Sequence, residues 1–85
     1  MYTYKTQGVC SQKIDFDIVE KDGVKVVSNV KFTGGCNGNT QGVARLVEGM
    51  EVNEAIGRIE GIRCGYKSTS CPDQLAKALK GALEA

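Results

Sequence analysis

The sequence contains no histidine, no block of like charges and no apolar run long enough to cross a bilayer. Without histidine there is no imidazole to act as a general base, to activate a nucleophile or to bind a metal. Chemistry with metals or electrons must therefore use thiolates, carboxylates and backbone groups. Residues 1–7 also lack the apolar region of a signal peptide, so we expect a cytoplasmic protein without membrane contacts.

Length and charge narrow the class of protein further. The chain has 85 residues and a net charge of +1, with 11 basic and 10 acidic residues spread along it. This even distribution argues against a nucleic-acid partner. We expect one domain over residues 1–85, close to the smallest size that buries an adequate core. Such small domains often gain stability from a metal, a disulfide or a second subunit, so a homodimer is compatible with the sequence.

Three stretches in the first half of the chain indicate β-strands. Residues 2–6 indicate a short strand, and apolar residues at alternate positions indicate longer strands near 13–21 and 24–33. Asp22-Gly23 between the two long strands is typical of a tight hairpin turn. We expect one face of this hairpin to be buried, through Ile14, Phe16, Ile18, Val24, Val26, Val30 and Phe32.

The second half of the chain predicts helices. Asn39 or Thr40 can cap a first helix, and a second is expected near 52–59. The last helix opens at Ser70–Pro72, where Ser70 and Asp73 approximate a capping box. The helix residues expected to face the sheet are Val43, Leu46, Leu75, Leu79 and Leu83. The fold class is α+β, an antiparallel β-meander of about three strands packed against two to three helices in a two-layer domain.

Four cysteines are the candidate functional residues: Cys10, Cys36, Cys64 and Cys71. Each falls in a predicted loop or at the boundary of an element, whereas a cysteine used only for packing more often lies on an apolar face. In a reducing compartment these thiols are not expected to form disulfides. The alternatives from spacing alone are a shared Cys₄ metal site or free thiols, because no C-x-x-C pair is present.

Cys71 is distinguished by its place at the start of the last helix. Free backbone N–H groups and the helix dipole favour an anion at that position, and the hydroxyls of Thr69 and Ser70 can either donate to the sulfur or cap the helix. The pentapeptide Thr69-Ser70-Cys71-Pro72-Asp73 also has a simpler reading as a well-formed helix start. Both interpretations remain open from the sequence.

The segment from Ser68 through Ala76 resembles the TSCPD-domain family, and the resemblance covers essentially the whole chain. That family is a stand-alone relative of the C-terminal domain of many adenosylcobalamin-dependent ribonucleotide reductases, and its four cysteines fall on the four cysteines of this chain. The resemblance implies an accessory of ribonucleotide reductase. Nucleotide reduction itself needs a large barrel that 85 residues cannot build, so we do not expect catalysis even where a label such as ribonucleoside-diphosphate reductase is inherited.

The chain also has a more distant resemblance to NifU-type iron–sulfur scaffold proteins. It rests on the run from Val30 to Asn39 and on the helix that begins near Cys71, and it implies that Cys10, Cys36 and Cys71 are shared ligands and Cys64 an added one. Where the scaffold family has an aspartate after its first cysteine this chain has Ser11 and Gln12, and Ser70 replaces a histidine before the last cysteine. These departures favour a closed four-thiolate site over an exchangeable one.

The function predicted from the sequence is a small non-enzymatic module that binds zinc through four thiolates. An iron–sulfur cluster is the alternative metal, and a metal-free purified form is compatible with reduced thiols. The alternative functions are an iron–sulfur scaffold or carrier, with the iron–sulfur machinery as partner, and a thiol-exchange accessory of a reductase that uses Cys64 and Cys71. We assign no catalytic residue, because the sequence shows no base–nucleophile pair.

Overall fold

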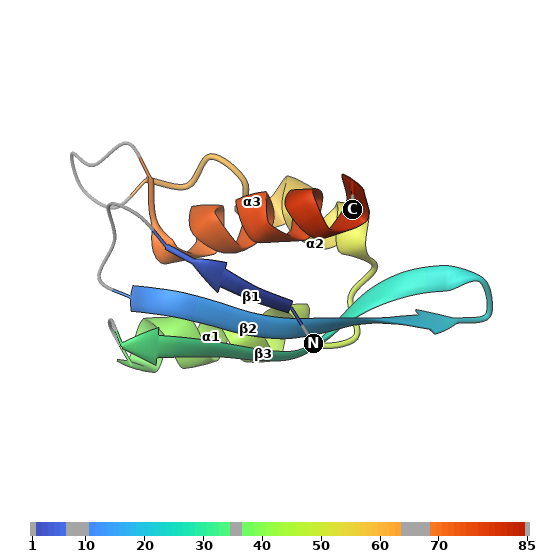
Figure 1. The fold of residues 1–85 in the computed structure, drawn as a ribbon, viewed down its shortest axis with the longest axis horizontal. Coiled ribbons are helices and arrows are strands. Elements are labelled where there is room, and N and C mark those ends of the chain that lie inside the picture. The colour runs from blue at the N-terminus through green and yellow to red at the C-terminus, as the bar shows by residue number, and fades with distance from the viewer. Residues whose placement is uncertain (1, 7–10, 35–36, 64–68, 85) are drawn as a thin grey trace.

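A computed structural model describes residues 2–6, 11–34, 37–63 and 69–84. The described residues form one antiparallel sheet of order β1-β2-β3 and three helices. Helices α2 and α3 pack together over one face of the sheet, and α1 runs along β3 (Figure 1). The predicted α+β meander is therefore confirmed. The elements are β1 Tyr2–Lys5, β2 Ser11–Lys21, β3 Val24–Gly34, α1 Asn37–Val47, α2 Val52–Ile59 and α3 Cys71–Glu84.

The hairpin between β2 and β3 has the turn that the sequence predicts. Asp22 and Gly23 have φ angles of 52° and 81°. Two consecutive positive φ values match the right-handed twist of the flanking strands, which is why Asp-Gly is favoured there. The strand boundaries agree with the predicted ones to within two residues at each end.

A β-bulge in β3 changes which valines face the core. Asp15 pairs with Lys31 but Asp17 pairs with Ser28, so two residues of β3 lie opposite one residue of β2. Asn29, the first residue of the bulge, has a φ of 55°, and its backbone N–H donates to Glu48 at 2.9 Å. Because an extra residue reverses the alternation of faces, Val27 takes the core position that unbroken alternation assigns to Ser28.

The core lies between the sheet and the helices. Four of the twelve residues predicted for it belong to its buried cluster, Val26 is also buried, and five more are partly buried against the cluster: Ile18, Val30, Phe32, Val43 and Leu83. The buried cluster contains Ile14, Phe16, Val27, Val47, Val52, Ala55, Ile56, Ile59, Leu75, Ala76, Ala78 and Leu79. The prediction is wrong for Val24, which is 45% exposed near the hairpin turn, and for Leu46, which is 76% exposed. Helix α1 packs mainly along one strand, so Val43 and Val47, one turn apart, are sufficient to contact the core.

The boundary of α1 also differs from the prediction. The helix begins at Asn37, so Thr40 lies inside it and is buried instead of capping it. By contrast, α2 has the predicted bounds and the predicted inward residues Ala55, Ile56 and Ile59. Among the described residues, no helix combines the length and the apolar character needed to cross a membrane.

Candidate functional site

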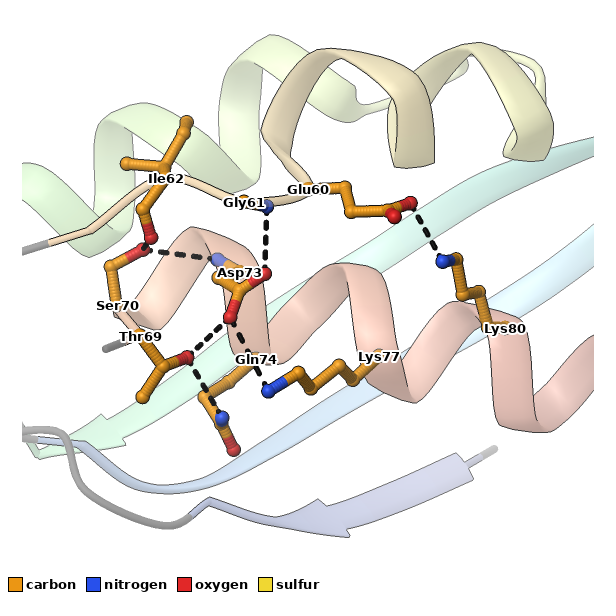
Figure 2. A network of polar contacts seen from close by, with 9 residues as sticks. All are labelled: Glu60, Gly61, Ile62, Thr69, Ser70, Asp73, Gln74, Lys77 and Lys80. Carbon is orange, nitrogen blue, oxygen red and sulfur yellow. Dashed lines mark hydrogen bonds and ion pairs between the residues drawn. The ribbon is translucent and has the colours of Figure 1, made fainter.

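The pentapeptide Thr69–Asp73 is buried throughout and begins α3 (Figure 2). The backbone carbonyl of Ser70 accepts the first helical hydrogen bond, from Gln74 N at 2.8 Å, and its Oγ accepts from Asp73 N at 3.1 Å. Ser70 is therefore the N-cap residue, with its side chain bound three residues ahead. The capping interpretation of this residue is confirmed.

The carboxylate of Asp73 makes hydrogen bonds other than the one expected in a capping box. In a capping box the third helical residue reaches back to the N-cap backbone, but here Oδ1 accepts from the backbone N–H of Gly61 at 2.8 Å. Oδ2 accepts from the Thr69 hydroxyl at 2.5 Å and lies 3.5 Å from Lys77 Nζ. Thr69 Oγ1 in turn accepts from Gln74 Nε2 at 3.0 Å. Figure 2 shows these groups converging on the carboxylate.

This polar network fixes how the chain enters α3 from α2. Ser70 Oγ donates to the carbonyl oxygen of Ile62 at 2.6 Å, next to the bond between Gly61 and Asp73. A further contact joins α3 to the end of α2: Lys80 Nζ lies 2.7 Å from Oε2 of Glu60, the residue that follows α2. The residues on both sides of the segment 64–68 are therefore bound to each other.

Cys71 lies in the first turn of α3 with 8% of its surface exposed. The structure does not support the predicted donation of the Thr69 and Ser70 hydroxyls to its sulfur. Each hydroxyl carries one proton, and these protons go to Asp73 and to the carbonyl of Ile62. The alternative, in which both hydroxyls organise the helix start, is the one observed.

Cys10, Cys36 and Cys64 lie outside the described residues, so their predicted convergence with Cys71 stays a prediction. Ser11 and Gly34, one residue after Cys10 and two before Cys36, are cross-strand partners in the sheet. The end of β1 is joined to this region, because Thr6 N donates to Gln12 O at 3.2 Å. Figure 1 shows the end of β1, the start of β2, the end of β3 and the start of α3 at the same end of the molecule.

The described part of the chain can also be searched for metal-binding groups other than the cysteines. Within these residues, no cluster of three or more cysteine or acidic side chains is arranged to hold a cation. Asp15 and Asp17 accept hydrogen bonds from the side chains of Thr3 and Asn29, respectively. The described acidic side chains therefore form no metal site of their own.

The family model described as TSCPD domain matches residues 2–83. The chain belongs to the TSCPD domain family. Searches of curated proteins and of solved structures give no match. The match runs from the start of β1 to the last turn of α3 and includes the motif Thr69–Asp73. The likeness to NifU-type scaffolds remains a prediction.

The motif of this TSCPD domain includes interactions that sequence reasoning did not predict. The sequence indicated that Ser70 and Asp73 cap α3, but it did not indicate the bond from Asp73 to Gly61 or the part of Gln74. The available signal was the group of polar residues around Cys71, since the four polar side chains of residues 69, 70, 73 and 74 are buried and require partners. Their partner at Gly61 depends on how α2 packs against α3.

Asp73 gives the TSCPD domain a testable dependence of stability on pH. Burial acts to raise its pKa, but the hydrogen bonds from Thr69 and Gly61 and the charge of Lys77 outweigh burial and hold the pKa below its ordinary value. A lowered folded-state pKa adds stability that is present above the unfolded pKa, about 3.9, and is lost as pH falls through the folded value.

We expect Asp73→Asn to lower the free energy of unfolding by about 1.5–3 kcal/mol near neutral pH, because hydrogen bonds to a charged acceptor are lost. The difference from the wild type should shrink as the pH falls below about 4. Urea unfolding of both proteins between neutral pH and pH values below about 4 measures this difference. The other carboxylates titrate in both proteins, so their contributions cancel when the two free energies are subtracted. A difference that does not change with pH would show that the charge of Asp73 contributes nothing.

Proposed function

We propose that this TSCPD domain is a non-enzymatic metal-binding module that holds a zinc ion through the thiolates of Cys10, Cys36, Cys64 and Cys71. The observation that carries the proposal is the common position of the chain segments that lead to these residues. The neighbours of Cys10 and Cys36 pair in the sheet through Ser11 and Gly34, and the bond from Ser70 to Ile62 joins the residues before Cys71 to those before Cys64.

The donor set fits zinc in its chemistry. Zn²⁺ prefers four sulfur or nitrogen ligands in structural sites, and a chain without histidine offers sulfur alone. When bound, the metal supplies cross-links between loops that are distant in sequence. The chain's own part is to present Cys71 from a helix start that Thr69, Ser70 and Asp73 hold with hydrogen bonds of their own.

A closed site of this kind suits a structural or accessory role. We propose, following the family resemblance, that the module acts beside a ribonucleotide reductase in the cytoplasm, where thiols stay reduced. Iron–sulfur transfer and thiol exchange remain the competing functions, since each would use the same cysteines. Iron–sulfur transfer requires a bound cluster that can leave the site. Thiol exchange requires cysteines that hold no metal and can be oxidised.

The expected result for protein purified without oxygen is one equivalent of zinc per chain and no colour. Elemental analysis together with the visible absorption spectrum measures both quantities. Brown protein containing iron and sulfide would favour the scaffold or carrier function. Protein with four reactive thiols and no metal, even after incubation with zinc, would contradict the metal-binding proposal.

A further inference from the structure

Part of β2, near the hairpin turn, forms an edge of the described sheet. Among the described residues, β1 pairs with β2 only as far as Tyr2, which lies opposite Phe16. From residue 17 to residue 21, β2 pairs with β3 alone in the part of the chain that the structure describes. Figure 1 shows the hairpin turn projecting beyond the helices at this end of the molecule. A sheet edge of this kind can pair with a further strand through its backbone groups.

The backbone groups of Ile18 and Glu20 point towards this edge. Ile18 lies opposite Val27 in β3. On the other side of β3, Val27 N donates to Met50 O at 2.9 Å and Val27 O accepts from Gly49 N at 2.8 Å. Ile18 and Val27 are therefore a pair without hydrogen bonds between them, so Ile18 directs its N–H and carbonyl away from β3. Glu20, two residues further along the strand, does the same.

The side chains on the solvent face of this edge are complementary to those of a second copy. Ile18 packs against the core, so Asp17, Val19 and Lys21 lie on the opposite face of the sheet. Val19 is 38% exposed. The acidic residue lies two positions before Val19 and the basic residue two positions after it. When two copies of the strand run antiparallel with Val19 opposite Val19, each Asp17 therefore lies opposite a Lys21.

We propose that this edge is the interface of a homodimer, in which the β2 strands of two copies pair antiparallel about a two-fold axis at Val19. Ile18 of each copy then exchanges backbone hydrogen bonds with Glu20 of the other, and the two sheets become one. The two Val19 side chains meet in a pair without hydrogen bonds, where cross-strand side chains are closest. This inference goes beyond the proposed function and does not depend on zinc.

Charges on a sheet edge can also keep copies apart, when like charges fall opposite each other. The pattern here is different, because antiparallel pairing at Val19 brings Asp17 and Lys21 together and so attracts the second copy. The remaining charge of the edge, Glu20, has Lys25 opposite it in its own hairpin. The dimer also leaves the start of α3 uncovered, since Figure 1 shows it at the end of the molecule away from the hairpin turn.

Sedimentation equilibrium of the full chain as purified tests the inference. A thiol reductant is present, so that disulfide-linked dimers are excluded. A single pair of strands forms an interface smaller than about 1,200 Å², which is typical of weak association. The measurement therefore extends to about 1 mM protein, and we expect a monomer–dimer equilibrium within that range. A wild type that is still monomeric at the highest concentration would overturn the inference.

Residue 19 gives the sharpest test, because the two-fold axis places it opposite itself. Val19→Lys and Val19→Glu should each weaken the dimer by about tenfold, since each puts like charges directly opposite. An equimolar mixture of the two variants should recover the wild-type association to within about threefold, because lysine then lies opposite glutamate. Leu46→Lys and Leu46→Glu are the matched controls. They change an exposed apolar residue on α1 and should leave the dimer unaffected, alone or mixed.

Lys21→Glu is an independent variant, in case a charge at residue 19 prevents folding. It places a glutamate opposite Asp17 of the second copy and should also weaken the dimer by about tenfold. A dimer that the folded variants at residues 19 and 21 leave unchanged would overturn the inference. So would a mixture of the two Val19 variants that associates no better than either alone. Weakening by the Leu46 variants as large as that at Val19 would mean that the copies meet through α1 instead.

Discussion

Replacement of Cys71 by serine is expected to lower the affinity for zinc by about a hundredfold or more. Structural zinc sites in small domains bind with about 10–16 kcal/mol, so each of four thiolates accounts for about 2.5–4 kcal/mol. Serine keeps the size of the side chain but is a poor zinc ligand at neutral pH. Competition with a chromophoric chelator measures the affinity of both proteins.

The stability of the metal-free proteins is the control for this experiment. Cys71 is buried at the helix start, so serine there can also alter folding. If the metal-free wild type and Cys71→Ser have similar unfolding free energies, the affinity loss reports on ligation. An unchanged affinity would mean that Cys71 is a small buried residue of a well-capped helix and that the zinc site lies elsewhere.

The second large effect concerns the core. Leu79 has no exposed surface and belongs to the buried stripe of α3 with Leu75. Leu79→Ala should lower the free energy of unfolding by about 2–5 kcal/mol, because the removed methyl groups leave a cavity that the core fills only partly. Urea unfolding of the metal-free protein measures the change.

Leu46 supplies a matched control for that measurement. It is also a leucine in a helix, but 76% of it is exposed, so Leu46→Ala should change stability by less than about 0.5 kcal/mol. Similar losses in the two variants would show that the assignment of the buried helix faces is wrong. If Leu46→Ala lowers the free energy of unfolding only under conditions in which the protein is oligomeric, a second molecule covers α1.

Local patterns account for the parts of the fold that the sequence predicts well. The Asp22-Gly23 turn and the bounds of α2 depend on short-range preferences, which act through neighbours in the chain. The same is true of Ser70 at the start of α3, where capping chemistry is visible in five residues. Each of these features can be read before any tertiary contact is known.

The predictions of buried residues are wrong where tertiary contacts determine which side chains face the core. The bulge at Asn29 is held by Glu48 from the end of α1 and by Asp17 across the sheet, so the exchange of faces at Val27 depends on a helix that follows later in the chain. The exposure of Leu46 depends on α1 packing along one strand. These outcomes follow from how elements meet, which alternation and helical periodicity do not encode.

In the candidate site, too, some features follow from the local sequence and others depend on tertiary packing. The placement of Cys71 and the capping role of Ser70 follow from the motif itself. The bond from Asp73 to Gly61 requires the end of α2 to lie beside the first turn of α3, and only the packed structure shows this. The ligand set of four cysteines comes from their positions at predicted boundaries and from the family resemblance, and it is the claim that most needs measurement.

X-ray absorption at the zinc edge tests that claim most directly. The anaerobically purified wild type should show about four sulfur scatterers at about 2.3 Å from the metal. The protein with Cys71→Ser, loaded with zinc under the same conditions, should show about three and one lighter atom. A first shell of oxygen or nitrogen in the wild type, or one that Cys71→Ser leaves unchanged, would contradict a zinc site built from Cys10, Cys36, Cys64 and Cys71.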